Sequence, residues 1–68
     1  MERIAVESRS LASVGYEAGT LEVEFVSGKV YRYFDVPEQT YASLLSAPEG
    51  RGGYFNAYIR GHYRYARV

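Results

Sequence analysis

Apolar and polar residues alternate along two neighbouring stretches in the first half of the chain. Leu21, Val23 and Phe25 alternate with glutamates, and the stretch from Lys29 to Val36 is rich in Val, Tyr and Phe without Gly or Pro. Alternation with a period of two predicts a strand with one buried and one solvated face, and β-branched and aromatic residues fit such a surface. We therefore predict two central strands joined by a hairpin.

The turn of this hairpin has two plausible lengths. A two-residue turn places Tyr31 and Tyr33 opposite glutamates, whereas a three-residue turn with Gly28 in the left-handed region places them opposite apolar residues. A slip of one residue exchanges the faces of a strand completely. We favour the three-residue turn, because it leaves Arg32 outside rather than on the apolar face.

Apolar residues upstream predict further strand structure. Ile4 and Val6 alternate, with the charged Arg3 and Glu7 around them, as in an edge strand, and apolar positions continue over residues 11–16. Gly15 lies inside that run and predicts a bulge or a close approach of another backbone. The pair Ala18-Gly19 predicts a turn.

A helix is predicted to follow the strands at residues 37–47. Pro37 suits the first helical position, and Tyr41, Leu44 and Leu45 have the spacing of one apolar stripe.

A second short helix is predicted at residues 54–63, after a flexible glycine-containing loop at residues 48–53. Its inward-facing residues are predicted to be Phe55, Ile59 and either Tyr58 or His62. Residues 64–68 form either a final strand or a segment along the surface.

These elements predict an α+β fold in one domain, residues 1–68. A small antiparallel β-meander of three to four strands is followed by two short helices packed on one face. The predicted core consists of Val14, Leu21, Val23, Phe25, Val36, Tyr41, Leu44, Leu45, Phe55 and Ile59. A meander leaves two open edges, and from these we predict a weak homodimer.

The amino-acid composition excludes several classes of protein for this chain. The 68 residues contain no cysteine, which excludes disulfides and thiolate metal sites. No apolar run approaches the ~20 residues of a membrane span, so we expect a cytoplasmic protein without a membrane partner. We also expect no cofactor and no bound metal.

Charge is distributed unevenly although the formal net charge is zero. All eight acidic residues lie in residues 1–49, whereas residues 50–68 carry four arginines and no acidic residue. Arginines interleaved with aromatic rings are typical of single-stranded nucleic-acid binding. The candidate nucleic-acid-binding residues are Arg51, Arg60, Tyr63, Arg64, Tyr65 and Arg67. In the alternative interpretation, which the zero net charge favours, the arginines offset helix and hairpin charges and the tyrosines belong to the core.

Tyr31 and Tyr33 have two interpretations as well. They form either an exposed stacking platform or a cover over the core beneath a helix, and we favour the cover because two helices must pack on large side chains. Enzyme chemistry is not expected, because His62 is the only histidine and no nucleophile or acid–base pair accompanies it. We therefore expect neither catalysis nor a small-molecule substrate.

Several short motifs stand out when they are taken as a set: Val14-Gly15-Tyr16, Leu21-x-Val23-x-Phe25, Gly28-x-x-Tyr31-x-Tyr33-x-x-Val36-Pro37, and Gly52-x-Tyr54-Phe55-Asn56 with Ile59-Arg60 and Tyr63. Over most of its length the chain resembles the KTSC domain, a small module found at the C-terminus of some lysyl-tRNA synthetases and as a free-standing bacterial protein. The resemblance implies no established activity, and attachment to synthetases suggests RNA as a partner. Relatives usually carry a serine before the glycine that precedes the second helix. This chain has Pro48-Glu49-Gly50 there, so no role of that serine carries over.

The sequence thus supports two hypotheses of function. One is a non-enzymatic module that binds RNA or single-stranded nucleic acid through the C-terminal Arg/Tyr-rich face. The other is a protein–protein interaction module, acting through self-association or a host protein.

Overall fold

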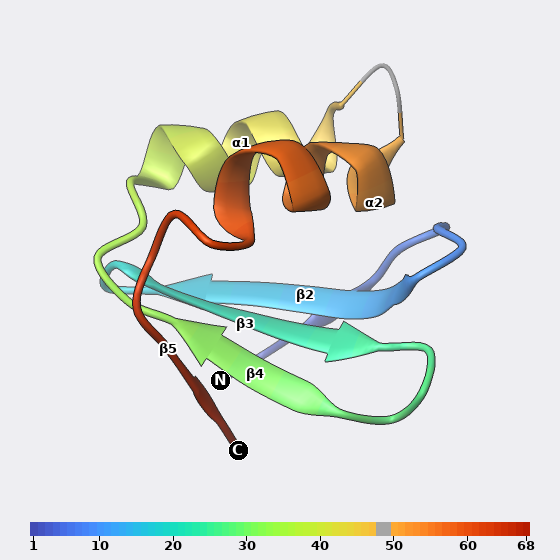
Figure 1. The fold of residues 1–68 in the computed structure, drawn as a ribbon, viewed down its shortest axis with the longest axis horizontal. Helices are drawn as coiled ribbons and strands as arrows, with labels where there is room; N and C mark the ends of the chain where they lie inside the picture. The colour runs from blue at the N-terminus through green and yellow to red at the C-terminus, as the bar shows by residue number, and fades with distance from the viewer. Residues whose placement is uncertain (48–49) are drawn as a thin grey trace.

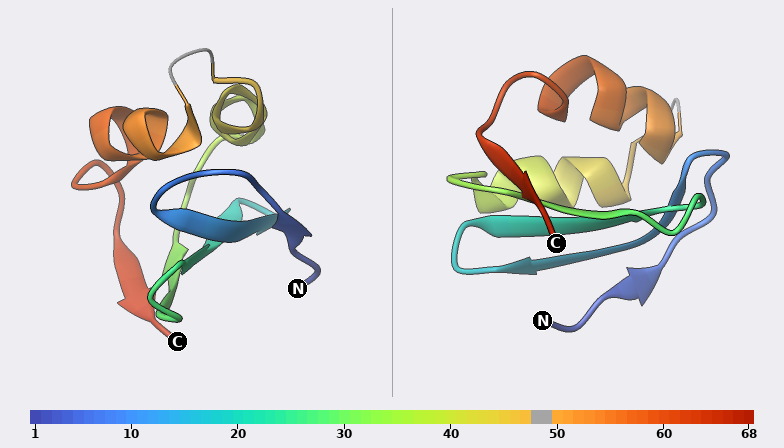
Figure 2. Two further views of the ribbon diagram at one scale, coloured as in Figure 1. Left: turned by 90° about the vertical axis from the view of Figure 1, so that its right-hand side faces the viewer. Right: turned by 60° about the horizontal axis from the view of Figure 1, so that its bottom comes forward.

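The strands form one five-stranded antiparallel sheet in the order β1-β2-β3-β4-β5. A computed structural model describes residues 1–47 and 50–68. The strands are β1 (Ile4–Ala5), β2 (Leu11–Glu17), β3 (Thr20–Phe25), β4 (Val30–Tyr33) and β5 (Tyr65–Arg67). Both helices lie on the same side of the sheet, and the two termini lie near its opposite edges (Figures 1 and 2). The α+β prediction is confirmed, but the sheet has one strand more than the predicted three to four.

The fifth strand comes from the C-terminal segment, for which the sequence left two possibilities open. Tyr65 pairs with Tyr33 and Arg67 pairs with Tyr31, so β5 closes the β4 side of the sheet. The chain returns to this position after the second helix, which brings it back above β4 (Figure 1).

The central hairpin has the three-residue turn predicted from the sequence. Tyr33 lies opposite Leu21 and Tyr31 lies opposite Val23. Gly28 has a φ of 94°, and its N–H donates to the Phe25 carbonyl at 2.9 Å. Glycine adopts this left-handed conformation without the penalty that a Cβ imposes, and this allows the turn to set the register.

Two further local predictions for the first strands are confirmed. Ala18 and Gly19 both have positive φ, 49° and 82°, as a two-residue hairpin turn requires. At Gly15 a Cβ would overlap the carbonyl oxygen of Glu2, so this glycine permits the close approach of the N-terminal segment. The register of β2 against β3 shifts between Leu11 and Ser13, which marks a bulge.

The first helix, α1 (Glu38–Leu45), is confirmed but is shorter than the predicted 37–47. Pro37 precedes it with extended backbone angles rather than occupying its first position, and Leu44 on its apolar stripe is fully buried. The second helix differs from its prediction. It begins as α2 (Arg51–Tyr54) and continues as a π-helical turn, η1 (Phe55–Ile59).

The predicted helix at 54–63 was therefore wrong at both ends. Residues 51–53 are helical rather than a loop, while positions 48 and 49 of that predicted loop lie outside the described residues. Arg60 has extended backbone angles and Gly61 has a φ of 81°, which ends the helix four residues early. The prediction that Tyr58 or His62 faces inward was also wrong, because both side chains are exposed.

The core lies between the sheet and the two helices. Its buried apolar residues are Leu11, Val14, Leu21, Val23, Tyr33, Val36, Leu44, Phe55 and Ile59. Leu11 and Tyr33 were absent from the predicted core. Three predicted core residues are only half-buried: Phe25, Tyr41 and Leu45. Tyr41 stacks on Tyr16 with ring centroids 5.1 Å apart, so each ring covers one face of the other at the margin of the core.

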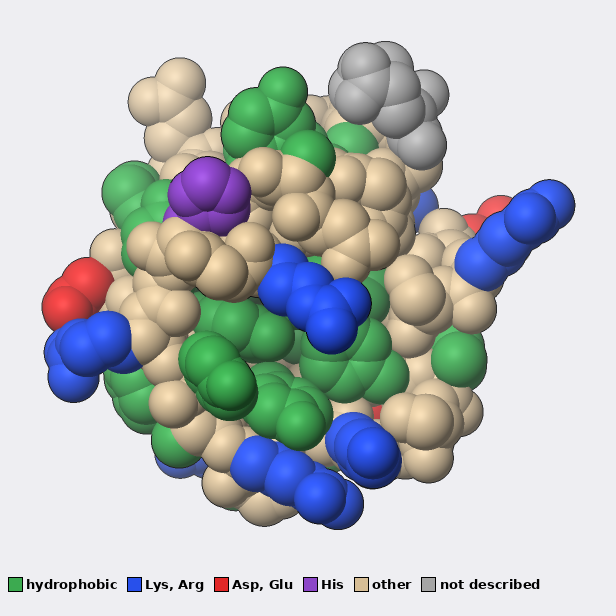
Figure 3. All heavy atoms as spheres, viewed as in Figure 1, with side chains coloured by type: hydrophobic (Ala, Val, Ile, Leu, Met, Phe, Trp, Pro, Cys, Tyr) green, Lys and Arg blue, Asp and Glu red, His purple; other side chains and the backbone are tan. Residues whose placement is uncertain are grey.

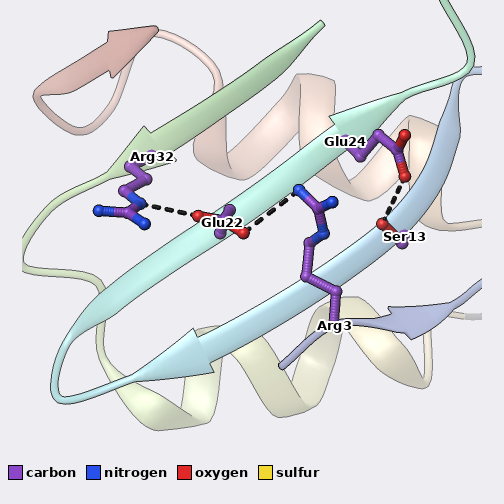
Figure 4. Close-up of polar contacts among 5 residues, drawn as sticks. All are labelled: Arg3, Ser13, Glu22, Glu24 and Arg32. Atoms are coloured by element: carbon purple, nitrogen blue, oxygen red, sulfur yellow. Dashed lines mark hydrogen bonds and ion pairs between the residues drawn. The ribbon is translucent and has the colours of Figure 1, made fainter. Parts of the chain in front are cut away.

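The opposite face of the sheet carries charges of both signs. Glu22 is 6% exposed and lies between two guanidinium groups, that of Arg3 at 3.2 Å and that of Arg32 at 2.7 Å (Figure 4). The Ser13 hydroxyl donates to Glu24 at 2.8 Å beside them. Arg32 thus lies on the outer face, as the favoured hairpin register predicted. These pairs balance charge on this face, so it does not form a basic surface.

Candidate nucleic-acid interface

A groove of about 600 Å³ lies on the helix side of the sheet, where β4 and β5 pass beneath the end of the second helix. Five aromatic rings line it: Phe25, Tyr31, Tyr33, Phe55 and Tyr65. Each ring contacts two others of the set, with centroids 5.4 or 5.7 Å apart. The five rings therefore form one closed chain of contacts, which we call the aromatic groove.

Strand register explains how these rings come together. Tyr31 and Tyr33 lie two residues apart on β4, so the pleat turns both toward the helices. Tyr65 lies directly opposite Tyr33 on β5. Phe55 comes from the second helix and meets Phe25 and Tyr33 with rings close to perpendicular, at 75° and 78°. Such edge-to-face contacts are favourable and hold the rings in fixed orientations.

Burial differs sharply across the aromatic groove. Tyr33 and Phe55 are 5% and 2% exposed, whereas Tyr65 is 61% exposed and Tyr31 is half-buried. Each of the two interpretations of the tyrosine pair, a cover over the core and an exposed stacking platform, thus applies to one of the two tyrosines. Tyr33 covers the core, and Tyr31 joins Tyr65 in offering ring surface to the solvent.

Three cations line the aromatic groove: Arg9, Lys29 and Arg60. Arg9 precedes β2, Lys29 lies in the central hairpin, and Arg60 is the first residue after the second helix. None of the described residues that line the groove is acidic. On this face of the molecule, hydrophobic side chains gather below the helices with Lys and Arg side chains around them (Figure 3).

Burial raises the pKa of the Tyr33 hydroxyl above its usual value, although the nearby positive charge of Arg60 acts in the opposite direction. The proximity of Tyr31 and Tyr65 adds to the increase. The Tyr33 hydroxyl therefore stays protonated at neutral pH and is available as a hydrogen-bond donor at the edge of the core.

The candidate residues from the sequence divide into two groups. Arg60 and Tyr65 line the aromatic groove, and Arg67 is paired with Tyr31 at its β5 side. The other candidates lie elsewhere. Tyr63 is half-buried against the core, and Arg64 bonds Asp35 at 3.1 Å.

Arg51 also lies apart from the aromatic groove. It lies at the start of the second helix, where its guanidinium is 3.5 Å from the Glu7 carbonyl. The four C-terminal arginines therefore do not converge on one surface.

Sequence reasoning missed two of the cations in the groove. Lys29 lies two residues before Tyr31, so strand alternation puts it on the same face as the tyrosine pair and contained a signal for it. Arg9 gave no local signal, because a tertiary contact brings it to the groove: the Val26 N–H donates to the Ser10 carbonyl at 2.9 Å, which places Arg9 beside the central hairpin. The second helix also packs tightly on this segment, since at Gly52 an added Cβ would lie 2.6 Å from the Ser10 hydroxyl.

We also searched the described part of the chain for a metal site, a catalytic histidine and a membrane-spanning helix. It contains no group of three or more His, Cys, Asp or Glu side chains placed to hold a metal ion. His62 is exposed, and its ring nitrogen Nε2 lies 3.1 Å from the Ala57 carbonyl, as expected of a histidine near a helix end. None of the described helices has the length and apolar character needed to cross a membrane.

Comparison with known proteins gives a consistent set of matches. The family model of the KTSC domain matches residues 7–63. An uncharacterised protein of Stutzerimonas stutzeri is 46% identical over 71 residues, which cover 100% of this chain and 99% of that protein. The lysine–tRNA ligase of Nostoc punctiforme is 41% identical over 49 residues, which cover 72% of this chain but 9% of the ligase. The crystal structure of a KTSC domain protein of Yersinia pestis has a TM-score of 0.93 at 29% identity, covering 98% of this chain and 96% of that one.

Proposed function

Because this chain belongs to the KTSC domain family, we propose that it is a small binding module and that its aromatic groove holds single-stranded RNA. The observation that carries the proposal is the composition of the groove. Five aromatic rings and three cations line it, and no acidic residue does so among those described. Bases stack on aromatic rings while Lys and Arg hold the phosphates, so this combination suits an unpaired nucleic-acid strand.

The charges around the rings favour an anionic ligand over a cationic one. Aromatic cages also bind quaternary ammonium groups, because the ring face is electronegative. A cationic ligand would be repelled here by Arg9, Lys29 and Arg60. An anionic ligand with flat ring systems fits both features, and a nucleotide strand is such a ligand.

Two considerations favour a single strand of RNA over a duplex. Tyr31 lies within the groove and is half-buried, so only an unpaired base that leaves its own stack can reach it. The 41% identity to a segment of a lysine–tRNA ligase supports RNA as the class of nucleic acid, since that enzyme acts on tRNA. Because the net charge is zero, bulk electrostatic attraction is weak, and the proposal relies on local contacts of the rings and the three cations.

The test is a titration of labelled single-stranded RNA against the full chain at two salt concentrations. A Lys29→Ala and Arg60→Ala double variant is expected to weaken binding across sequences. It should also lower the slope of log K against log salt by about 1.4, because each single-strand phosphate contact contributes about 0.7. Tyr65→Ala is expected to cost about 1–3 kcal/mol of binding free energy with little change in that slope.

Arg32→Gln is a control for the loss per charge, because it removes one positive charge from the opposite face of the sheet and keeps an amide that can still donate to Glu22. It should leave the affinity within about two-fold, as expected for a distant screened charge. Absence of micromolar binding at low salt would overturn the proposal. So would equal losses in Arg32→Gln and in the groove variants.

A second candidate function is pairing of β5 with a strand from another chain, most simply a second copy. Two backbone hydrogen bonds flank β5 on the side of β4. The Phe34 N–H, just after β4, donates to the Arg64 carbonyl, and the Val68 N–H donates to the Val30 carbonyl, both at 2.9 Å. Alternation along an antiparallel strand directs the N–H groups of Tyr65 and Arg67 away from β4. β5 is the last strand of the described sheet, so this row of donors and acceptors is a template for pairing.

A further inference from the structure

A second, shallower hollow of about 520 Å³ lies next to the aromatic groove, on the other side of Tyr65. It is lined by Phe34, Gly61, His62, Tyr63, Arg64 and Tyr65. Gly61 and Tyr65 line the aromatic groove as well, so the two depressions share a boundary. Tyr65 is 61% exposed, and its ring is therefore accessible at that boundary.

This hollow repeats the chemistry of the groove on a smaller scale. The Arg64 guanidinium lies 5.7 Å from the centroid of the Phe34 ring, so a cation and an aromatic surface are adjacent. His62 and Tyr63 add two more rings. A flat base and its phosphate need the same two elements that the aromatic groove offers.

Among the described residues, Asp35 is the acidic group that pairs with a cation of this hollow. Its carboxylate lies 3.1 Å from Arg64, and the two side chains are 85% and 78% exposed. An ion pair this exposed contributes little, because water screens both charges and the long side chain loses freedom in forming it. A phosphate arriving at the hollow can therefore take over Arg64 at small cost.

We propose that this hollow is a second base subsite, and that a single strand continues from the aromatic groove over Tyr65 into it. The proposal rests on the proposed function, because it extends the path of the same ligand. It assigns Arg64 as the phosphate-binding residue of the second subsite. It also assigns Asp35 as an internal competitor that reduces the affinity for strands long enough to reach that subsite.

The experiment compares a uridine dinucleotide with a uridine hexanucleotide by NMR titration of the full chain. The dinucleotide is expected to shift the amide signals of Lys29, Tyr31 and Arg60 alone. The hexanucleotide should shift those of His62 and Arg64 as well. Arg64→Gln should weaken hexanucleotide binding by about two- to five-fold, the effect of one exposed charge contact, and leave the dinucleotide unchanged.

Asp35→Asn is expected to change the affinity for the hexanucleotide in the opposite direction from Arg64→Gln. Asp35 has a φ of 58°, and Asn tolerates this left-handed conformation well, so the variant should fold. It is expected to tighten hexanucleotide binding by about two- to five-fold without affecting the dinucleotide. Glu2→Gln removes the same charge at the opposite edge of the sheet and is expected to change neither affinity.

The outcomes separate this inference from the proposed function. If both oligonucleotides shift the groove signals but Arg64→Gln and Asp35→Asn match the parent, the second subsite is wrong and the groove stands. A gain in Glu2→Gln equal to that in Asp35→Asn would also refute the subsite, because bulk charge would then explain both. If neither oligonucleotide binds, the proposed function fails and this extension fails with it.

Discussion

Phe55→Ala tests whether the second helix belongs to the core and forms the back of the aromatic groove. Phe55 is 2% exposed and meets Phe25 and Tyr33 edge-to-face, both at 5.4 Å. Truncating a buried Phe to Ala costs about 3–5 kcal/mol, which includes lost burial and the cavity left behind. A chain of 68 residues has a total stability of roughly 3–10 kcal/mol, at about 0.05–0.15 kcal/mol per residue. The loss is therefore expected to leave the variant partly or wholly unfolded at room temperature.

Urea denaturation followed by circular dichroism measures this loss against two companion variants. Phe55→Leu keeps most of the volume and is expected to cost below about 1.5 kcal/mol. Asn56→Ala changes the exposed neighbour on the same helical turn and should stay within about 0.5 kcal/mol of the parent. If Phe55→Ala lost less than about 1 kcal/mol, the reasoning would be refuted, because no side chain buried in this way is so cheaply removed.

Two further predictions concern the loss of folding stability at alkaline pH and the self-association of the chain. Burial raises the pKa of Tyr33, so its contribution is fully present below about pH 10, where the unfolded chain titrates, and is lost as the pH rises toward the folded pKa. Tyr33→Phe should therefore lose less stability than the parent when the pH is raised from about pH 8 to about pH 11. Tyr58→Phe, at a 56% exposed position, is the control and should lose as much as the parent. If the urea midpoints of all three proteins fell equally over this range, the prediction would be contradicted. Sedimentation equilibrium at high protein concentration is expected to show a weak homodimer that Arg67→Pro abolishes, because proline removes an N–H directed away from β4 without removing a bond to it. A strict monomer, or a dimer indifferent to Arg67→Pro, would exclude pairing through β5.

The central hairpin shows what could be predicted from neighbouring residues. Gly28 and the alternation of the flanking strands were enough to choose the three-residue turn, because the competing register would have put Arg32 on the apolar face. The close approach at Gly15 was predictable for a similar reason, since glycine inside a strand run signals missing space for a Cβ. Both signals act over a few residues and need no knowledge of distant contacts.

The second helix shows where such reasoning stops. Its glycines suggested a loop over residues 51–53, yet Gly52 is helical and packs closely against the Ser10 hydroxyl. Intrinsic propensity disfavours glycine in a helix by only about 1 kcal/mol relative to Ala, and tertiary contacts such as the one with Ser10 routinely outweigh a preference of this size.

The candidate site divides in the same way. The sequence by itself determined that aromatic rings and arginines are concentrated toward the C-terminus, and that Tyr31 and Tyr33 share one face of a strand. Only the tertiary structure decided that Arg60 and Tyr65 meet Arg9 and Lys29 around one groove, while Arg51 lies apart. Periodicity and turn chemistry specify which side of an element a residue occupies, because these effects depend on bonds and sterics within a few residues. Which faces of the helices and strands pack together depends on the free energy of burying apolar surface between segments that are far apart in the sequence. No local sequence pattern contains that contribution.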